Sequence, residues 1–399
     1  MNGSALAIPT VTKPRLRRIA VFAHLWLGLI TGIFISLMGF TGGVVGLRPQ
    51  IVTLLSPASP QTGSCAGVDW NRAAEDVIAT THSEINRVYG PYGTDTRYHF
   101  RMMTGTPVIY RHVIYDACAG RVLGTIDLAW MDWTVDLHHN LLAGNTGRTW
   151  AGFIGIAMLV SGLSGLCVWL LTKPDLRRLF AVSFPFSRRT PRELHRAIGV
   201  IAAFLLVAEA FTGLWLCFPQ TMRGMLLTVA AAPEDVRPVR APRTAGSPAM
   251  GKKPSSPAPV APAGLADLMA AAQAALPDGL IREIRMPDGN GTVQVRMWRP
   301  GDFRSLGNNV VYISRAKAQV LTVDRYSDRS ASSRFVQAMA GLHYDEWGGL
   351  PFRILSAVAG LLTPVLFLSG ILIWWFSRRR KTAAIAKQPV AEAEIARIY

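Results

Sequence analysis

The chain has 399 residues, of which 50% are hydrophobic and 17% are charged. Because an average soluble domain carries about 25% charged residues, this composition disfavours a soluble protein and excludes a disordered chain. The net charge of +17 would suggest a nucleic-acid partner if the basic residues covered one folded surface. Instead they flank long apolar stretches, which points to a membrane protein.

Four apolar stretches are each long enough to cross a bilayer, which takes about 20 helical residues. Three contain no Asp, Glu, Lys or Arg, and the one that follows Arg196 contains only Glu209. The first is about twice as long as a signal-peptide core, so we expect it to be retained. No stretch suggests a discontinuous helix, which argues against a transporter. We expect four spans, within the ranges 19–47, 138–172, 196–218 and 343–377.

Basic residues mark one side of the membrane. The tail 1–18, the loop 173–195 and the tail 378–399 are rich in Lys and Arg close to the spans, whereas the segments 48–137 and 219–342 are sparse in them there. By the positive-inside rule, both termini are expected in the cytoplasm and both long segments in the periplasm of a bacterium, with the protein in the inner membrane. The basic excess is thereby assigned to topology, and no nucleic-acid partner is expected.

Each outer segment is predicted to be a helix followed by an antiparallel sheet. The stretch 231–264 is rich in Pro, Ala and Ser and predicts a linker. Helices are predicted at 69–86 and 265–276. Strands are predicted at 98–103, 108–115, 121–127, 280–286, 292–299, 310–314 and 319–324. The expected fold class is a mainly α membrane protein with four transmembrane helices from a duplicated unit and two periplasmic α+β domains.

Two of the four cysteines, Cys65 and Cys118, lie in these outer segments. In an oxidising compartment they could form a disulfide, and two unpaired thiols are the equal alternative. Cys167 and Cys217 lie in spans and are interpreted as small apolar residues.

An internal repeat carries the functional signal. His24 and His195 are each followed by Gly at an offset of 4 and by Thr-Gly at an offset of 17. His138 and His343 are each followed by Gly, Arg, Ser, Gly and Trp at offsets of 6, 10, 26, 27 and 31. Since five identical offsets are hard to attribute to chance, we predict a duplicated unit of helix, outer domain and helix.

The four repeated histidines form two pairs, one at each membrane face. His24 and His195 are expected at the cytoplasmic ends of their helices, and His138 and His343 at the periplasmic interface. Imidazole is a common axial ligand of haem iron, and two per iron suit electron transfer. Each histidine alone could be an interfacial polar residue, but the matched set favours haem b, two per chain. His139 is a weaker candidate than His138 because its repeat position holds Tyr344.

Small residues beside the histidines fit the same interpretation. Gly28 and Gly199 share a helix face with His24 and His195, because residues four apart are neighbours on a helix. A flat macrocycle against a helix needs such small residues, although the same pattern permits helix packing without haem.

These features resemble the PepSY-associated transmembrane proteins, often called iron-regulated membrane proteins. The resemblance covers nearly the whole chain, and the insert 231–264 departs from the family's pattern. It implies four spans in a bacterial inner membrane and outer domains similar to PepSY modules. It also implies that the repeated histidines are axial haem-iron ligands. The matching motifs are His24-Leu-Trp-Leu-Gly28, Leu137-His138, Leu194-His195-Arg196 and Leu342-His343, with the late Thr-Gly or Ser-Gly of each span and Trp374-Trp375.

Some members of that family are di-haem reductases, so the resemblance implies a ferric-siderophore reductase, an oxidoreductase that releases Fe(II) from an Fe(III) chelate in the periplasm for iron uptake. The segment 219–342 carries sixteen basic and nine acidic residues, a balance that could attract an anionic chelate. The cytoplasmic segments are too short for a flavin or nicotinamide domain, so a quinol or a cytoplasmic reductase must supply the electrons. The alternative is a haem-free PepSY sensor or a membrane-anchored peptidase-binding module.

Glu209 is a further candidate, because acids inside a membrane are costly and are usually functional or paired. It could tune a cofactor, relay a proton or meet a quinol. A structural hydrogen bond between helices is an equal alternative.

Overall fold

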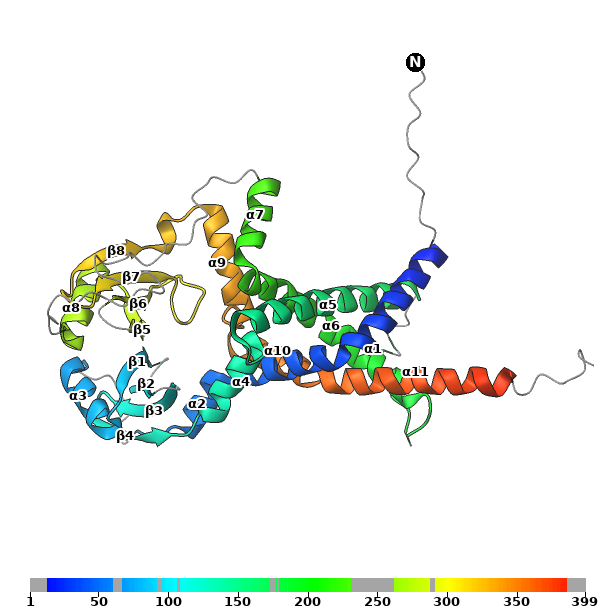
Figure 1. Cartoon of the computed structure of the whole chain (residues 1–399), viewed down its shortest axis with the longest axis horizontal. Helices are drawn as coiled ribbons and strands as arrows, with labels where there is room; N and C mark the ends of the chain where they lie inside the picture. The colour runs from blue at the N-terminus through cyan, green and yellow to red at the C-terminus, as the bar shows by residue number, and fades with distance from the viewer. Residues whose placement is uncertain are drawn as a thin grey trace, which may run out of the picture. The chain divides into compact units, whose positions relative to one another are not determined.

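The computed structural model divides the chain into two units (Figure 1). Residues up to 46, 136–218 and 350 onward form the membrane unit, and residues 47–135 and 219–349 form the sheet unit. The structure describes residues 13–59, 67–91, 95–105, 108–172, 177, 179–184, 186–230, 262–287 and 291–385. The predicted linker 231–264 lies outside these ranges except for its last three residues.

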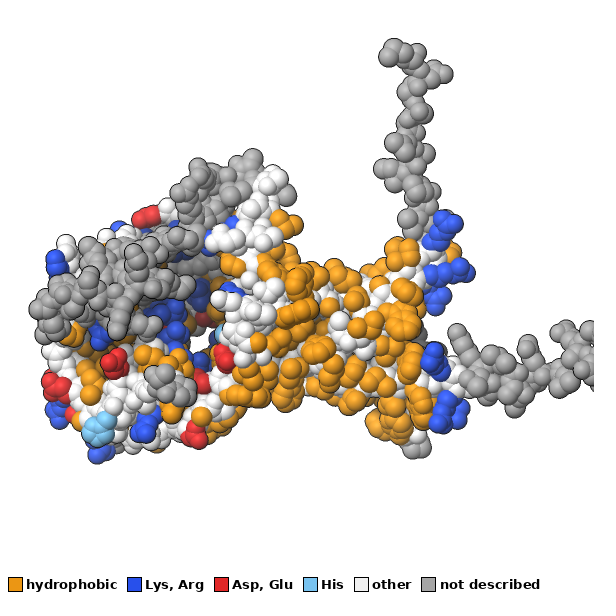
Figure 2. Space-filling model, viewed as in Figure 1, with side chains coloured by type: hydrophobic (Ala, Val, Ile, Leu, Met, Phe, Trp, Pro, Cys, Tyr) orange, Lys and Arg blue, Asp and Glu red, His pale blue; other side chains and the backbone are white. Residues whose placement is uncertain are grey.

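Four spans in the described part of the chain are long and apolar enough to cross a membrane, which confirms the expected number. Figure 2 shows the side chains of these helices as an extended apolar surface, with Lys and Arg gathered where it ends. The first three spans are α1 (Lys13–Gly46), α5 (Gly144–Leu171) and α6 (Thr190–Cys217). The fourth consists of α10 (Gly349–Leu361) and α11 (Thr363–Ile385).

The fourth span runs from Gly349 to Arg379 and has a one-residue break in its helix at Leu362. Pro364 has no backbone N–H and cannot donate to the carbonyl of Gly360, four residues earlier. The Thr363 hydroxyl lies 2.7 Å from that carbonyl and 3.1 Å from the carbonyl of Ser36 in α1. The Ser36 hydroxyl in turn donates to the Thr363 carbonyl at 3.3 Å. The break is therefore satisfied by hydroxyl groups and joined to the neighbouring helix.

The sheet unit contains two successive segments, each a helix followed by four strands. The first holds α3 (Trp70–Thr81), β1 (Glu84–Tyr89), β2 (Arg97–Thr104), β3 (Ile109–Asp116) and β4 (Arg121–Ile126). The second holds α8 (Leu265–Ala275), β5 (Leu280–Arg285), β6 (Thr292–Trp298), β7 (Asn309–Ser314) and β8 (Val320–Asp324). The remaining elements are α2 (Arg48–Leu55), α4 (Ala129–Asn140), α7 (Pro219–Ala230), the 3₁₀ helix η2 (Tyr326–Asp328) and α9 (Ala331–His343).

Strand β1 begins within the predicted helix 69–86, so that prediction is wrong at its C-terminal end. The Asp69 side chain caps α3 by accepting a hydrogen bond from the N–H of Arg72 at 3.1 Å. The helix ends at His82, whose φ of 50° is left-handed, and the chain then becomes extended. All seven predicted strands and the predicted helix 265–276 are present with small shifts of their ends.

The eight strands form one antiparallel sheet in the order β4-β3-β2-β1-β5-β6-β7-β8. Two separate α+β domains were expected, and the difference lies in the pairing of β1 with β5. Val88 in β1 lies opposite Ile284 in β5. This pairing removes an exposed strand edge from each segment, which is the physical reason for one sheet.

One hydrophobic core lies between this sheet and the helices α3 and α8. Side chains of a strand alternate between its two faces, so Val88 and Ile284 point to the helices while their neighbours point away. Val88, Ile284 and Leu268 of α8 are each 1% exposed or less. Both segments therefore contribute to a single packed interior.

Cys118 is disulfide-bonded, and its expected partner Cys65 lies outside the described residues. Cys167 and Cys217 are free thiols within α5 and α6.

We predict that Ile284→Ala loosens both halves of the sheet together. Truncating a buried Ile costs about 2–5 kcal/mol, and this side chain belongs to the core that both segments share. Hydrogen exchange of the full chain, followed by mass spectrometry, should show faster exchange in β2 and β3 as well as in β6 and β7. Ile109→Ala, at a position that is 57% exposed, is the control. Faster exchange confined to β5–β8 would contradict a common core.

Candidate functional site

His24 and His195 lie close together inside the membrane unit. His24 belongs to α1 and His195 to α6, and their ring centroids are 6.0 Å apart with the planes inclined by 75°. Both rings are half-buried among the helices. The structure thus brings together the first pair of predicted site residues.

Each of these rings forms a hydrogen bond to the backbone of another span. Nδ1 of His24 lies 2.9 Å from the carbonyl oxygen of Ser161 in α5. Nδ1 of His195 lies 3.0 Å from the carbonyl oxygen of Leu366 and 2.9 Å from the hydroxyl of Ser369, both in α11. Because a carbonyl can only accept, the proton of each neutral ring is on Nδ1 and the lone pair is on Nε2. That is the tautomer in which Nε2 can bind a metal.

A glycine of another span lies against each ring, and the ring of His24 needs the space that its glycine leaves. A Cβ built on Gly165 of α5 would lie 2.9 Å from Cε1 of His24, closer than side chains normally approach. A Cβ on Gly370 of α11 would lie 3.6 Å from Cε1 of His195. Gly165 and Gly370 belong to the repeated Ser-Gly pairs, whose function the sequence did not reveal. They form the surface on which the histidine rings pack.

His138 has the same surroundings at the other end of α1. It lies in α4, with Nδ1 3.1 Å from the carbonyl of Met38 and 3.2 Å from the Thr41 hydroxyl. A Cβ on Gly42 would lie 2.9 Å from its Cε1. Thr41-Gly42 is therefore the counterpart of the Ser-Gly pairs. His24 and Thr41 are 17 residues apart on one helix, which is about 25 Å along its axis.

The remaining histidine candidates differ in their surroundings. His343 is the last residue of α9, in the sheet unit, and its ring centroid lies 6.0 Å from that of Tyr344. Its pairing with His138 therefore stays a prediction. His139 lies beside His138, with ring centroids 5.9 Å apart, and its side chain is exposed.

The surroundings of His24 and His195 fit a haem. Two imidazoles on one iron have ring centroids roughly 6 Å apart, since each metal–nitrogen bond is about 2 Å. A Cβ on Gly28, one turn from His24, meets no atom within 4 Å, so this face has free space. Gly199 is more enclosed, with a Cβ position 3.6 Å from the Leu366 side chain. The indole N–H of Trp169, one turn beyond Gly165, is buried and has no hydrogen-bond partner in the described structure, so it could donate to a bound group.

Glu209 takes part in a hydrogen bond between helices. The hydroxyl of Ser356 in α10 donates to Oε1 of Glu209 in α6 at 3.1 Å. The structural alternative considered for this residue is therefore present in the membrane unit, and its other predicted roles stay predictions.

The sequence did not reveal a second histidine cluster, which lies in the sheet unit. Nε2 of His99 lies 2.8 Å from Nδ1 of His112, and Nε2 of His112 lies 2.8 Å from Oδ2 of Asp132. Asp132 also pairs with Arg48 at 3.2 Å, and Tyr89 stacks on the His99 ring. Because the carboxylate accepts, His112 donates through Nε2 and accepts through Nδ1 from His99. These residues come from β2, β3, α4, α2 and β1, and no sequence spacing connects them.

Burial and charge set the protonation of this cluster. Burial, followed by the neighbouring His112, Arg48 and Arg101, holds the pKa of His99 well below its usual range. Burial alone would raise the pKa of Asp132, but the hydrogen bond from His112 and the charges of Arg48 and Arg101 outweigh it and lower that pKa. His99 is thus neutral and Asp132 ionised at neutral pH.

We predict that the stability of the sheet unit falls as the pH drops below about 6.5. There the unfolded chain protonates His99 while the folded chain does not, so acid favours unfolding by up to about 1.4 kcal/mol per pH unit. The lowered pKa of Asp132 adds a further loss below about pH 4, where the unfolded chain protonates this carboxyl. Thermal unfolding of the full chain between pH 7.5 and 5.5 measures the first effect. His99→Gln should flatten the dependence, whereas His82→Asn, at an exposed left-handed position, should leave it unchanged.

One family model matches the chain, and it is described as the PepSY-associated TM region. The match extends over residues 22–377 and so includes most of the first and fourth spans, the second and third spans and the sheet unit. No curated protein matches the chain. The protein is therefore a member of the family defined by the PepSY-associated transmembrane region.

Proposed function

We propose that the protein is a haem-dependent reductase of the bacterial inner membrane, which reduces a ferric siderophore in the periplasm and releases Fe(II) for uptake. The observation that carries the proposal is the pair His24 and His195, with ring centroids 6.0 Å apart and both Nδ1 atoms bound to helix carbonyls. A half-buried pair of imidazoles with matching tautomers is suited to hold one iron between them.

Two haems b are proposed, one for each histidine pair. His24 and His195 would hold one, with Gly28 leaving room beside the ring of His24. His138 and His343 would hold the other, by analogy with the repeated sequence. Haem supplies one-electron transfer when it is bound.

The chain's own residues fix the ligand geometry. The carbonyls of Ser161 and Leu366 keep the proton on Nδ1 and hold each ring in one orientation, as outer partners of metal-bound histidines commonly do. Two histidine ligands on one iron would favour electron transfer over oxygen binding.

The substrate side follows from the chemistry of iron. Siderophores bind Fe(III) through hard oxygen donors, and Fe(II), which is softer, is held more weakly. One electron per iron therefore weakens the chelate and releases the metal. The basic end of the membrane unit is assigned to the cytoplasm, and a quinol or a cytoplasmic reductase is the proposed electron donor.

The absorption spectrum of the purified protein tests the proposal. We expect a Soret band that shifts on addition of dithionite and about two haems per chain by the pyridine haemochrome assay. His195→Ala should remove one haem and leave the other. Folded protein that stays colourless when it is produced with adequate haem would contradict the proposal and favour a haem-free sensor or peptidase-binding module.

Fe(II) release provides the functional readout. His343→Ala should sharply lower the reduction of a ferric siderophore, measured as ferrozine-trapped Fe(II) with the reduced protein in liposomes. His139→Ala is the matched control and should have little effect. If His343→Ala reduces the chelate at the wild-type rate, the reductase assignment fails.

We predict that Gly165→Ala disturbs the haem site through one added methyl group. The new Cβ would lie 2.9 Å from Cε1 of His24, so the ring must move away from its hydrogen bond with Ser161. The expected result is loss of one haem or a change of its spectrum from low spin to high spin. Gly155→Ala on the same helix, where the Cβ would make an ordinary 3.5 Å contact, should keep the wild-type spectrum. Identical spectra for both variants would show that the His24 ring does not need the space left by Gly165.

A further inference from the structure

Three arginines stand side by side across the middle of the sheet. Arg101 in β2 lies directly opposite Arg87 in β1, and Arg87 lies directly opposite Arg285 in β5. All three are on the face that points away from α3 and α8, because their strand neighbours Val88, Phe100 and Ile284 belong to the core. Like charges directly opposite each other destabilise a sheet. A row of three arginines therefore destabilises the folded sheet, and strand pairing alone gives no reason for it.

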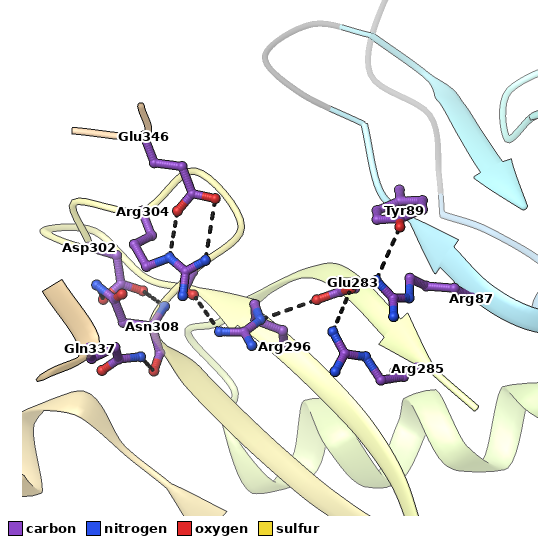
Figure 3. Close-up of polar contacts among 11 residues, drawn as sticks. Arg87, Tyr89, Glu283, Arg285, Arg296, Asp302, Arg304, Asn308, Gln337 and Glu346 are labelled. Atoms are coloured by element: carbon purple, nitrogen blue, oxygen red, sulfur yellow. Dashed lines mark hydrogen bonds and ion pairs between the residues drawn. The ribbon is translucent and has the colours of Figure 1, made fainter. Parts of the chain in front are cut away.

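Glu283 holds part of this row in place (Figure 3). Its carboxylate lies 3.2 Å from Arg87, 3.4 Å from Arg285 and 3.2 Å from Arg296 of β6. The Arg87 guanidinium also donates to the Tyr89 hydroxyl at 3.2 Å. One buried carboxylate thus orients three guanidinium groups and balances one of their charges.

Arg304, next along this surface, pairs with Glu346 through two hydrogen bonds (Figure 3). The whole set, here called the arginine face, has five cations and two anions, an excess of three positive charges. Its members are Arg87, Arg101, Arg285, Arg296, Arg304, Glu283 and Glu346. Asp302, the other acid in Figure 3, accepts hydrogen bonds from the backbone N–H and side-chain amide of Asn308 and from the side-chain amide of Asn309.

Burial disfavours the charged form of two arginines on this face. Burial and the charge of Arg304 lower the pKa of Arg296, and burial and the charge of Arg87 lower that of Arg101, although nearby anionic groups partly offset both effects. Arg285 is the most accessible of the arginines on this face that form an ion pair, with 42% of its side chain exposed. The arginine face therefore combines fixed, partly desolvated donors with an accessible cation at its centre.

We propose that the arginine face binds an anion with several carboxylate oxygens and that the ferric chelate of the proposed function is of this anionic, carboxylate-bearing class. Guanidinium groups present forked donors that match carboxylate oxygens two at a time, and several such groups fixed in a row match a ligand with several carboxylates. Glu283 pre-orients the donors, so the ligand loses little binding energy in ordering them. The class of chelate rests on the proposed function, whereas the anion site itself does not.

Binding of redox-inert Ga(III) complexes to the full chain in detergent tests this proposal by calorimetry. We expect the anionic Ga(III) complex of citrate to bind, more weakly as KCl increases, and a Ga(III) trihydroxamate complex without free carboxylates to bind far less. Arg285→Gln and Arg101→Gln should each weaken citrate-complex binding about tenfold, the size expected when a charged hydrogen-bond donor is lost. Arg72→Gln removes the same charge from an exposed position on α3, which covers the other face of the sheet, and should leave the affinity unchanged.

Equal affinity of the Arg285→Gln, Arg101→Gln and Arg72→Gln variants for the citrate complex, or preference for the trihydroxamate, would overturn the proposal. Metal-free citrate and inorganic phosphate are separate arms of the experiment. If either binds as tightly as the Ga(III) complex, the face is a general anion site and the chelate assignment fails. Ga(III) binding needs no electron transfer, so a colourless protein that binds the citrate complex would refute the reductase and retain the anion site. If a haem-containing protein reduces a siderophore equally well with and without Arg285 and Arg101, the reductase is retained and the anion site is refuted.

Discussion

A histidine ring packed on a glycine of the neighbouring helix, with Nδ1 bound to a carbonyl of that helix, is the contact on which the membrane unit depends. It occurs for His24 on α5, for His195 on α11 and for His138 on α1. Because the ring fills the place of a side chain, the same contact sets how closely the helices approach. Because the carbonyl accepts the ring proton, it also selects the nitrogen that is left for a metal. Helix packing and ligand chemistry are thus decided by one arrangement.

The sheet unit is organised by a different constraint, the alternation of side chains across a shared sheet. One face carries Val88 and Ile284 into a common apolar core, while the other carries Arg87, Arg285 and the buried acid Glu283. Polar groups on this second face are satisfied by one another, as in the chain from His99 through His112 to Asp132. Since both faces belong to the same strands, the core determines where every charged group on the opposite face stands.

The sequence was sufficient for the features that depend on local pattern. Apolar length gave the four spans, and identical spacings singled out His24 and His195, which lie together in the structure. The strand β1 was missed because the helix signal of α3 runs into it with no break before His82. The pairing of β1 with β5 and the His99–His112 contact depend on residues from separate strands, for which a single sequence carries no periodic signal. The repeated Ser-Gly and Thr-Gly pairs could be recognised in the sequence. Their contact with the imidazole rings could not, because it depends on how the helices pack.

The pairing of β1 with β5 also affects the biogenesis of the protein. Val88 finds its partner Ile284 only after two further spans and the second segment have been synthesised. Until then the first segment presents an unpaired strand edge, the kind of surface that joins other chains into aggregates. Closure of a pairing so distant in sequence is slow, because the intervening chain must be brought together first. Biogenesis therefore includes an interval in which the β1 edge is exposed and can pair with another chain.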